Sequence, residues 1–322
     1  MSCLNQTRPA DEIIVVDDCS TDESPKILQT FGSRIHVIKT LSNRGNKSYA
    51  LEVGLPFVRG DIIIITDADT LLDPEFVAAI IKQFDNPHVA AVSGYVKSIP
   101  YNWLTACREL EYLIAQDLHK KAISTFGALF VVPGCAGAFR VDLFRRFITF
   151  DHDTIAEDLD FTYKLMKRGY HIAFTRDAVV YTQDPHTISS NIQQVRRWYR
   201  GAWQNLRKHR DALIKPINAL ELSMSYTEGF VFPLTLIIMP ILDISFLRLT
   251  AIFYALFSAT VGILGAYTRK RLDLLYYSPF FPFISLLSAY LFLEQLIATA
   301  LVGNQEMRWH KPERTYIDTQ TI

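Results

Sequence analysis

The sequence predicts an α/β domain followed by an α-helical membrane region. In the first half, short β-branched runs alternate with segments of helical periodicity, which is the pattern of a doubly wound α/β layer. In the second half, apolar segments of membrane-spanning length replace this pattern. The 322 residues are enough for one sizeable domain and an additional membrane region.

The first strand and helix are separated by acidic residues. Glu12–Val16 is a β-branched run that stops at Asp17 and Asp18, and Ser24–Phe31 has the composition of a helix. Residues 34–39 are expected to form the next strand and residues 47–58 the next helix. Taken alone, the two aspartates could be ordinary turn and cap residues at the end of a strand.

A second acidic pair follows the next strand. Asp61–Thr66 contains four consecutive isoleucines, which suit a strand buried on both faces of a parallel sheet. Asp67 and Asp69 come directly after it, at the carboxyl end where α/β sheets bind ligands. Paired carboxylates at this place can hold a divalent cation such as Mg²⁺ or Mn²⁺. The alternative is that both are turn residues, because D-x-D is frequent by chance.

Further elements are expected along the rest of the domain. Residues 74–84 and 103–122 are expected to be helical, and 89–95 to form a strand. Gly134–Arg140 indicates a close-approach loop or the start of a strand, since glycine and alanine let the backbone lie against a ligand.

Two more motifs lie on predicted helices. Glu157, Asp158 and Asp160 stand before a helix over 161–167, where first-turn acids are also favoured by the helix dipole. A helix over 192–210 carries Gln194, Arg197 and Trp198. Its alternative interpretation is an arginine-rich surface against anionic lipid. Separately, Arg196 and Arg200 are expected to be surface or lipid contacts.

Three apolar segments have spanning length: Gly229–Leu247, Leu249–Tyr267 and Ser278–Val302. Residues 213–228 mix apolar and polar side chains and are expected to lie along the membrane surface. Basic residues before the first segment and between the second and third favour a cytoplasmic location for both regions, which makes the first two segments a hairpin. The basic tail conflicts with a third crossing, so either Pro279 and Pro282 mark a re-entrant piece or the first segment does not fully cross.

Net charge gives no indication of a nucleic-acid partner. Lysine plus arginine and aspartate plus glutamate are balanced at 33 each. The basic residues gather beside the apolar segments instead, which indicates a lipid bilayer as the charged surface that the chain meets.

Four motifs in this order, Asp17–Asp22, Asp67–Asp69, Glu157–Asp160 and Gln194–Trp198, resemble those of the processive family 2 glycosyltransferases. That family contains the hyaluronan, chitin and cellulose synthases and the bacterial poly-N-acetylglucosamine synthases. The resemblance implies a GT-A type nucleotide-sugar-binding domain with a Rossmann-like mixed sheet, here over residues 1–212, before an interfacial segment over 213–228 and a membrane region of two or three helices over 229–322.

The resemblance also implies how the donor is bound. Asp17 or Asp18 inherits the hydrogen bonds to the uracil and ribose, and Lys47 matches the family's lysine beside the nucleotide. Asp67 and Asp69 correspond to the metal-binding pair, with Asp67 also facing the donor.

On the acceptor side, Asp158 matches the family's catalytic base and Glu157 is its acidic neighbour. Gln194 and Trp198 match residues at the acceptor end of the site. Arg197 offers a forked donor set suited to diphosphate oxygens, and Trp198 a flat face on which a sugar can stack.

The sequence departs from the family pattern in a few places. Cys19 and Asn46 replace glycines, and Ala156 replaces a threonine. Family members usually begin with membrane helices and a further first strand, for which this sequence has no counterpart, so a sheet edge and one wall of the uracil site are expected to be open.

The resulting hypothesis is an inverting enzyme of the cell membrane, multi-pass, with its catalytic domain facing the cytosol. It would add N-acetylglucosamine from a UDP-sugar to a growing β-linked polysaccharide; whether it has an accessory membrane subunit is left open. One alternative is a non-processive transferase that loads one sugar onto a polyprenyl phosphate. The other is a non-catalytic, truncated synthase fragment.

Overall fold

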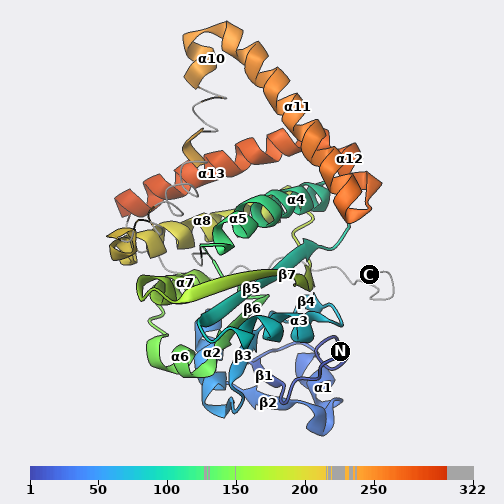
Figure 1. The fold of residues 1–322 in the computed structure, drawn as a ribbon, viewed down its shortest axis with the longest axis vertical. Coiled ribbons are helices and arrows are strands. Elements are labelled where there is room, and N and C mark those ends of the chain that lie inside the picture. Colours follow the sequence, from blue (N-terminus) through green and yellow to red (C-terminus); the bar gives the residue numbers. More distant parts are fainter. Residues whose placement is uncertain are drawn as a thin grey trace.

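The computed structural model describes the chain except for residues 127, 128, 130, 149, 215, 217, 218, 220–228, 232–234, 236, 237 and 303–322. Its elements stack along the long axis, with a sheet domain at one end and apolar helices at the other (Figure 1). The expected order of an α/β domain followed by apolar helices is therefore present.

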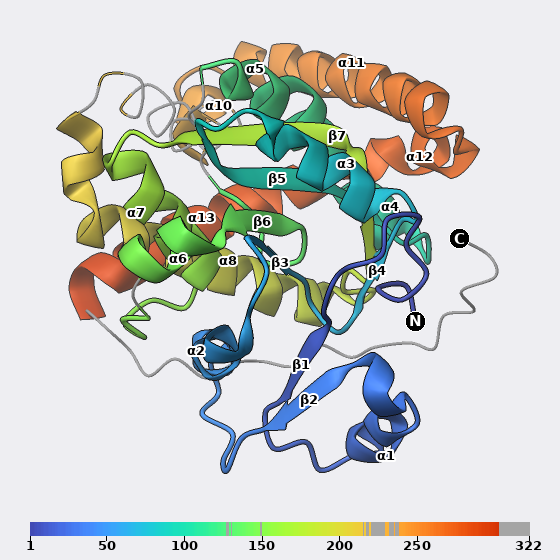
Figure 2. The same ribbon diagram turned by 60° about the horizontal axis from the view of Figure 1, so that its bottom comes forward.

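The first strands form a small sheet of their own. β1 (Ile14–Asp17) pairs in parallel with β2 (His36–Lys39), and α1 (Ser24–Gln29) lies between them in the chain. Figure 2 shows this pair apart from the main sheet. α2 (Lys47–Gly54) packs on β1 so closely that an added Cβ at its last residue would lie 3.0 Å from a methyl group of Val16.

The main sheet has five strands in the order β3-β6-β5-β7-β4. Only the β5–β7 pair is parallel; the β3–β6, β5–β6 and β4–β7 pairs are antiparallel. The mixed sheet expected from the resemblance is confirmed. The strands are β3 Ile62–Ile65, β4 Thr70–Leu72, β5 Val89–Ser98, β6 Gly137–Arg140 and β7 His171–Thr182.

The isoleucine strand was predicted to be buried on both faces of a parallel sheet, and this environment was wrong. β3 pairs antiparallel with β6 and lies at an edge of the five-stranded sheet, with Ile65 buried but Ile62, Ile63 and Ile64 only half-buried. An apolar run in the sequence does not indicate which strand will pair with it. The partner here is β6, which comes after a long helical stretch and runs antiparallel to β3. A direct strand-helix-strand crossover would instead have given a parallel pair.

Helices cover both faces of the main sheet. On one face, α3 (Phe76–Lys82) packs Phe76 and Ile80 against Val92. On the other, α6 (Val141–Phe147) and α7 (Glu157–Lys167) bury aromatic side chains such as Phe161. Each fully buried side chain of this size stabilises the fold by about 1.5–3 kcal/mol.

The N-terminal segment also supports α3. Gln6 belongs to a stretch that the sequence pattern would assign to a linker, yet its side chain is buried. Its amide nitrogen donates to the carbonyl of Asp73 at 2.9 Å, and its amide oxygen accepts from the backbone of Val77 at 3.0 Å. These bonds satisfy polar groups at the start of the helix.

Long helices separate the sheet domain from the apolar end (Figure 1). One stretch comprises α4 (Trp103–Leu113), a π-helical segment (Ile114–Lys120) and α5 (Lys121–Ser124), and the other is α8 (Ile188–Lys208). α4 packs Leu110 against Leu274 and Ile284 of the apolar end. The helices there are α10 Met239–Leu242, α11 Ile244–Arg269, α12 Leu272–Tyr277 and α13 Phe281–Val302.

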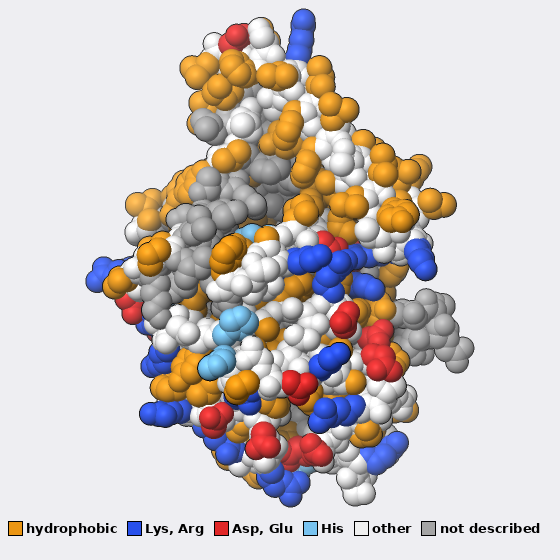
Figure 3. Space-filling model, viewed as in Figure 1, with side chains coloured by type: hydrophobic (Ala, Val, Ile, Leu, Met, Phe, Trp, Pro, Cys, Tyr) orange, Lys and Arg blue, Asp and Glu red, His pale blue; other side chains and the backbone are white. Residues whose placement is uncertain are grey.

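Two helical stretches, Ile244–Arg269 and Leu272–Leu301, are long and apolar enough to cross a membrane. Hydrophobic side chains gather over this end in Figure 3, whereas acidic and basic ones predominate over the sheet domain. Ile241 is 78% exposed and Leu242 74% exposed. A large exposed apolar surface of this kind indicates contact with lipid or protein.

The predicted membrane segments are matched in part. α11 begins before the predicted Leu249 and continues past Tyr267, and Ser278–Val302 corresponds to a short 3-10 turn followed by α13. Residues 232–234, 236 and 237 of Gly229–Leu247 and most of the interfacial segment 213–228 lie outside the described residues.

Candidate active site

Lys47 starts α2 and is presented by a helix cap. The side chain of Asn46 accepts a hydrogen bond from the backbone of Ser48 at 3.0 Å. Asn46 has φ −140° and ψ 131°, an extended conformation that requires no glycine. The departure from the family's glycine at this position is therefore compatible with the local backbone.

The ammonium group of Lys47 joins two distant parts of the chain. It forms an ion pair with Asp67 and donates to the carbonyl of Gly134 at 2.7 Å. The side chain is 18% exposed and that of Asp67 is 38% exposed. Burial alone would lower the pKa of Lys47, but the carboxylates of Asp67, Glu157 and Asp158 outweigh it and raise the pKa above its usual range.

Gly134 connects this pair to α7. Its backbone N–H donates to Oδ2 of Asp158 at 3.0 Å, while its carbonyl accepts from Lys47. An added Cβ would lie 3.0 Å from the ammonium nitrogen of Lys47, so the glycine is needed for this approach. Of the two expectations for Gly134–Arg140, the start of a strand is present, as β6, and a close approach to a ligand stays a prediction. A single chain of contacts runs from Asp67 through Lys47 and Gly134 to Asp158.

The acid pair at the start of α7 is held in a low-polarity setting. Glu157 is 8% exposed. Burial, reinforced by the neighbouring Asp158 carboxylate, raises the pKa of Glu157 to about 7. Asp158 also accepts from the backbone of Leu159 at 2.8 Å, which fixes its carboxylate at the helix start. Glu157 therefore holds its proton over much of the range below neutral pH.

α8 packs against the turn that leads into this acid pair. Gln204 accepts from the backbone of Ile155 at 3.1 Å, and Asn205 donates to the carbonyl of Ala156 at 3.1 Å. At Gly201 an added Cβ would lie only 2.5 Å from the Cβ of Ala156. The helix with the Gln-Arg-Trp motif is thus fixed directly to the turn before Asp158.

The motif residues lie on the half of α8 toward its N-terminus. Trp198 is 38% exposed, and the guanidinium of Arg108 from α4 lies 4.6 Å from its ring centroid. Gln194 is half-buried and its side-chain oxygen has no hydrogen-bond partner among the described residues. Arg197 is half-buried one position before the tryptophan.

Asp17 and Asp18 lie at the end of β1 and stabilise their own turn. Asp17 is buried and accepts from the backbone of Ser20 at 2.9 Å, and Asp18 accepts from the hydroxyl of Thr40 at 2.8 Å. Cys19 adopts φ 60°, a conformation that glycine tolerates best, which explains why glycine is usual there in the family.

A divalent cation fits the Asp67 and Asp69 pair chemically. Both carboxylates follow β3 and both are half-buried, so solvent and substrate can reach them. Mg²⁺ is commonly held by one or two carboxylates together with substrate phosphates. No cluster of three or more metal-ligating side chains exists within the described part of the chain, so the nucleotide would have to complete the coordination.

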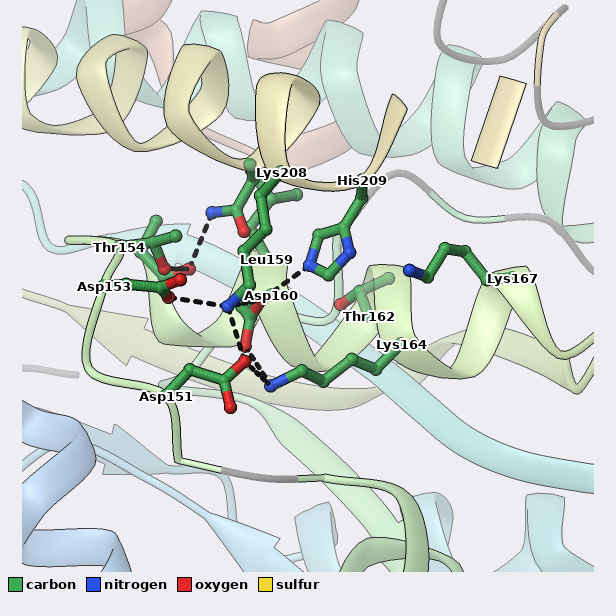
Figure 4. Close-up of polar contacts among 12 residues, drawn as sticks. Asp151, Asp153, Thr154, Leu159, Asp160, Thr162, Lys164, Lys167, Lys208 and His209 are labelled. Atoms are coloured by element: carbon green, nitrogen blue, oxygen red, sulfur yellow. Dashed lines mark hydrogen bonds and ion pairs between the residues drawn. The ribbon is translucent and has the colours of Figure 1, made fainter. Parts of the chain in front are cut away.

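Asp160 belongs to a different cluster of polar contacts, with Lys164, Lys208 and His209 (Figure 4). Its carboxylate contacts His209 at 2.6 Å, Lys164 at 2.6 Å and Lys208 at 2.9 Å. Lys208 also pairs with Asp153 at 2.6 Å. Asp160 therefore connects α7 to the end of α8, and this structural role agrees with its interpretation as a first-turn acid.

Arg196 and Arg200 were expected to be surface or lipid contacts, and the structure gives both of them partners on α13. Arg196 forms two hydrogen bonds of 2.7 Å each with Glu294 of α13, and Arg200 donates to Gln295 at 3.0 Å. The sequence did not indicate these partners because both lie about a hundred residues further along the chain.

Sequence reasoning missed Arg108 and Glu109, which are buried in α4. Glu109 pairs with Arg269 of α11 at 2.5 Å. The sequence signal that could have found them is a pair of adjacent charged residues among the apolar residues of the predicted helix.

Comparisons with known proteins agree with this arrangement. The model of the family described as glycosyl transferase family group 2 matches residues 62–293. An N-acetylglucosaminyltransferase from Azorhizobium caulinodans is 26% identical over 217 residues, covering 63% of this chain and 54% of that protein. A poly-beta-1,6-N-acetyl-D-glucosamine synthase from Staphylococcus epidermidis is 28% identical over 210 residues, covering 64% of this chain and 50% of that protein. The chain thus spans about half the length of these curated relatives.

A solved structure shares the fold. The mannosyltransferase PcManGT from Pyrobaculum calidifontis, in complex with GDP-Man and Mn²⁺, superposes with a TM-score of 0.59 at 21% identity. The match covers 91% of this chain and 80% of that one. The sheet domain therefore has the GT-A type architecture.

Proposed function

The chain belongs to glycosyl transferase family group 2, and on that premise we propose that it is a membrane-bound inverting enzyme that extends a β-linked polysaccharide from a UDP-sugar. The contact chain from Asp67 through Lys47 and Gly134 to Asp158 carries the proposal, because it joins the donor side to the acid pair. N-acetylglucosamine is the proposed sugar, since relatives named for its transfer or polymerisation match 63% and 64% of this chain.

We assign the donor side to Asp67, Asp69 and Lys47. Mg²⁺ or Mn²⁺ held by the two aspartates would neutralise the leaving diphosphate; the Mn²⁺ in the PcManGT structure supports a divalent cation in this fold. Lys47 pairs with Asp67 and supplies a further positive charge for the diphosphate. Asp17 and Asp18 are proposed to contact the uridine, and Arg197 the diphosphate.

Asp158 is proposed as the base. It takes the proton of the acceptor hydroxyl while the hydroxyl oxygen bonds to the anomeric carbon and the bond from that carbon to the diphosphate breaks. The raised pKa of Glu157 keeps that neighbour protonated through much of the range below neutral pH, which limits charge repulsion as Asp158 takes part. Inversion follows from attack opposite the leaving group.

The acceptor end is assigned to Gln194, Trp198 and Glu157. Stacking of the terminal sugar on Trp198 would keep the chain end beside the donor after each transfer. The two apolar helices would hold the enzyme in the cell membrane, in a multi-pass arrangement with the sheet domain facing the cytosol.

The test uses the full chain in membrane vesicles with radiolabelled UDP-N-acetylglucosamine and Mn²⁺, and resolves products by size. We expect long polymer from the wild type, none with excess chelator, and none from Asp69→Asn at unchanged thermal stability. Full turnover in chelator would exclude the metal assignment.

The two alternatives give different outcomes in this assay. A single sugar on a lipid carrier would support a polyprenyl-phosphate transferase and reject polymer synthesis. Binding of UDP without any transfer under every condition would support a non-catalytic protein.

A further inference from the structure

One face of the Trp198 ring is occupied by a buried cation. Arg108 of α4 is 4% exposed, and its guanidinium carbon lies 4.6 Å from the centroid of the Trp198 ring. The same carbon lies 5.5 Å from the ring centroid of Tyr112, so the tryptophan is the closer aromatic partner. A desolvated cation on a tryptophan face is among the stronger cation–π contacts.

The guanidinium is held in place by acidic groups on both sides. Arg108 forms an ion pair with Glu111 in its own helix, and its Nε lies 3.8 Å from Asp184, whose side chain is 1% exposed. The hydroxyl of Tyr112 donates to Asp184 at 2.9 Å, which orients that carboxylate. Since α8 begins shortly after Asp184, these contacts fix α4 against the helix that carries the tryptophan.

Two nitrogens of Arg108, Nε and Nη2, have no hydrogen-bond partner within the described part of the chain, although the residue is buried. An arginine placed only to pair with carboxylates would direct its donors at them, as bidentate pairs do. Here the planar group lies over the indole instead. The ion pairs alone therefore do not explain the position of the Arg108 guanidinium, and its contact with the Trp198 ring is needed as well.

We propose that Arg108 is a positioning residue for the acceptor: it sets the plane of the Trp198 ring and leaves only the opposite face for the sugar. This inference rests on the proposed function, in which Trp198 binds the acceptor. Because α4 also packs against α11 and α13, Arg108 fixes the tryptophan relative to the membrane helices. The sugar end is thereby kept in line with the helices toward which the product moves.

The experiment compares Arg108→Gln, Arg108→Lys, Trp198→Ala and the Arg108→Gln/Trp198→Ala double variant in vesicles containing the full chain. The measurements are the KM for a β-linked N-acetylglucosamine pentasaccharide, the Kd for UDP-N-acetylglucosamine, mean product length and the fraction of donor sugar transferred to water. Arg146→Gln is the matched control, since Arg146 is an exposed arginine 5.1 Å from the Phe147 ring centroid, on α6.

We expect Arg108→Gln to raise the pentasaccharide KM by about 3- to 30-fold, to shorten the product and to increase transfer to water. Donor Kd should not change, and Arg108→Lys should restore part of the loss because it keeps the charge. In the double variant the KM should equal that of Trp198→Ala alone, since Arg108 acts through the ring.

Other results separate the two claims. If Trp198→Ala leaves the pentasaccharide KM unchanged, the acceptor role of the tryptophan fails and this inference fails with it. If Trp198→Ala raises the KM but a stably folded Arg108→Gln does not, or if the two effects add in the double variant, only the positioning role is rejected. Should Arg108→Gln unfold, Arg108→Gln/Asp184→Asn removes both charges of that pair, and an unchanged pentasaccharide KM in that variant likewise rejects the positioning role.

Discussion

At the scale of single residues, Gly134 brings the two sides of the site together. Its backbone N–H donates to the Asp158 side chain and its carbonyl accepts from the Lys47 side chain, so Gly134 joins the two side chains through its backbone alone. Two changes at this scale test the arrangement.

The first residue-scale prediction concerns the proposed base. Asp158→Asn should lower the transfer rate by about 100-fold or more because an amide cannot take the proton of the acceptor hydroxyl. Donor binding should persist, since the amide keeps the size of the carboxylate. Initial rates and a calorimetric titration with UDP-N-acetylglucosamine measure both quantities, and loss of donor binding would assign Asp158 to the nucleotide site instead.

The second concerns the loop itself. Gly134→Ala places a methyl group 3.0 Å from the Lys47 ammonium, which must shift by a few tenths of an ångström and thereby disturb its ion pair with Asp67. We expect the donor KM to rise by about 5-fold or more, as for a mild overpacking of a fixed contact. Gly60→Ala is the control, because its nearest neighbour would lie at an ordinary 3.6 Å. Equal KM values for the two variants would show that the ammonium position is unimportant.

At the scale of elements, α7 serves two directions at once. Asp158 accepts from Gly134 of the site. Asp160 is directed at Lys164, Lys208 and His209 (Figure 4). Burial would raise the pKa of Asp160, but hydrogen bonds from those three partners lower it below its ordinary value of 3.8. The carboxylate is therefore more stable ionised in the folded state than in the unfolded chain.

This gives a prediction for acid stability. Because the folded-state pKa of Asp160 is depressed, its contribution is present above about pH 4 and is lost as the pH falls through the lower folded value. Asp160→Asn should cost about 1–3 kcal/mol near neutral pH, because Lys164 and Lys208 lose one charged hydrogen-bond partner but keep Asp151 and Asp153. Urea unfolding between about pH 5 and pH 3 should show the difference from wild type shrinking.

The control for the acid series is Asp142→Asn, an exposed carboxylate on α6. It should follow the wild-type curve at each pH. A wild-type and Asp160→Asn difference that stays constant down to the lowest pH would mean that Asp160 does not carry this stabilisation as an ion.

At the scale of the whole molecule, a buried ion pair joins the apolar helices to the sheet domain. Arg269 at the end of α11 is 7% exposed and pairs with Glu109 of α4, which is 1% exposed. Glu109 also accepts from the backbone of Ser98 in β5 at 2.6 Å. The end of one apolar helix is thus connected to β5 of the main sheet through the Glu109 carboxylate and through the Tyr95 hydroxyl, which also accepts from Arg269.

Arg269→Met should therefore destabilise the whole assembly by about 3–5 kcal/mol, because Glu109 would be left buried without its cation. Lys270→Met is the matched control: it removes the same charge at the next position, where the side chain is exposed. Thermal unfolding in detergent measures the cost, and limited proteolysis reports loosening between α11 and α4. Equal midpoints for the two variants would contradict a structural role for the pair.

The sequence alone determined several of the main elements, although β4 and β7 were not expected from it. Periodicity and strand-end chemistry, which are local properties, predict the strands before Asp17 and Asp67 and the helix starting at Lys47. They also predict the long apolar helix that contains Leu249. Family resemblance then supplied the expectation that the motifs meet, and Lys47, Asp67 and Asp158 do so. The nucleotide role of Asp17 and Asp18 stays a prediction.

Only the tertiary structure decided which partners these elements meet. The pairing of β3 with β6, of Arg196 with Glu294 and of Arg269 with Glu109 joins residues far apart in the chain. A local pattern specifies which face of a helix or strand is apolar, but not what covers it. A charged residue such as Arg108 is expected from the sequence to be exposed to solvent, because only a folded environment can supply the carboxylates and the ring that make its burial favourable.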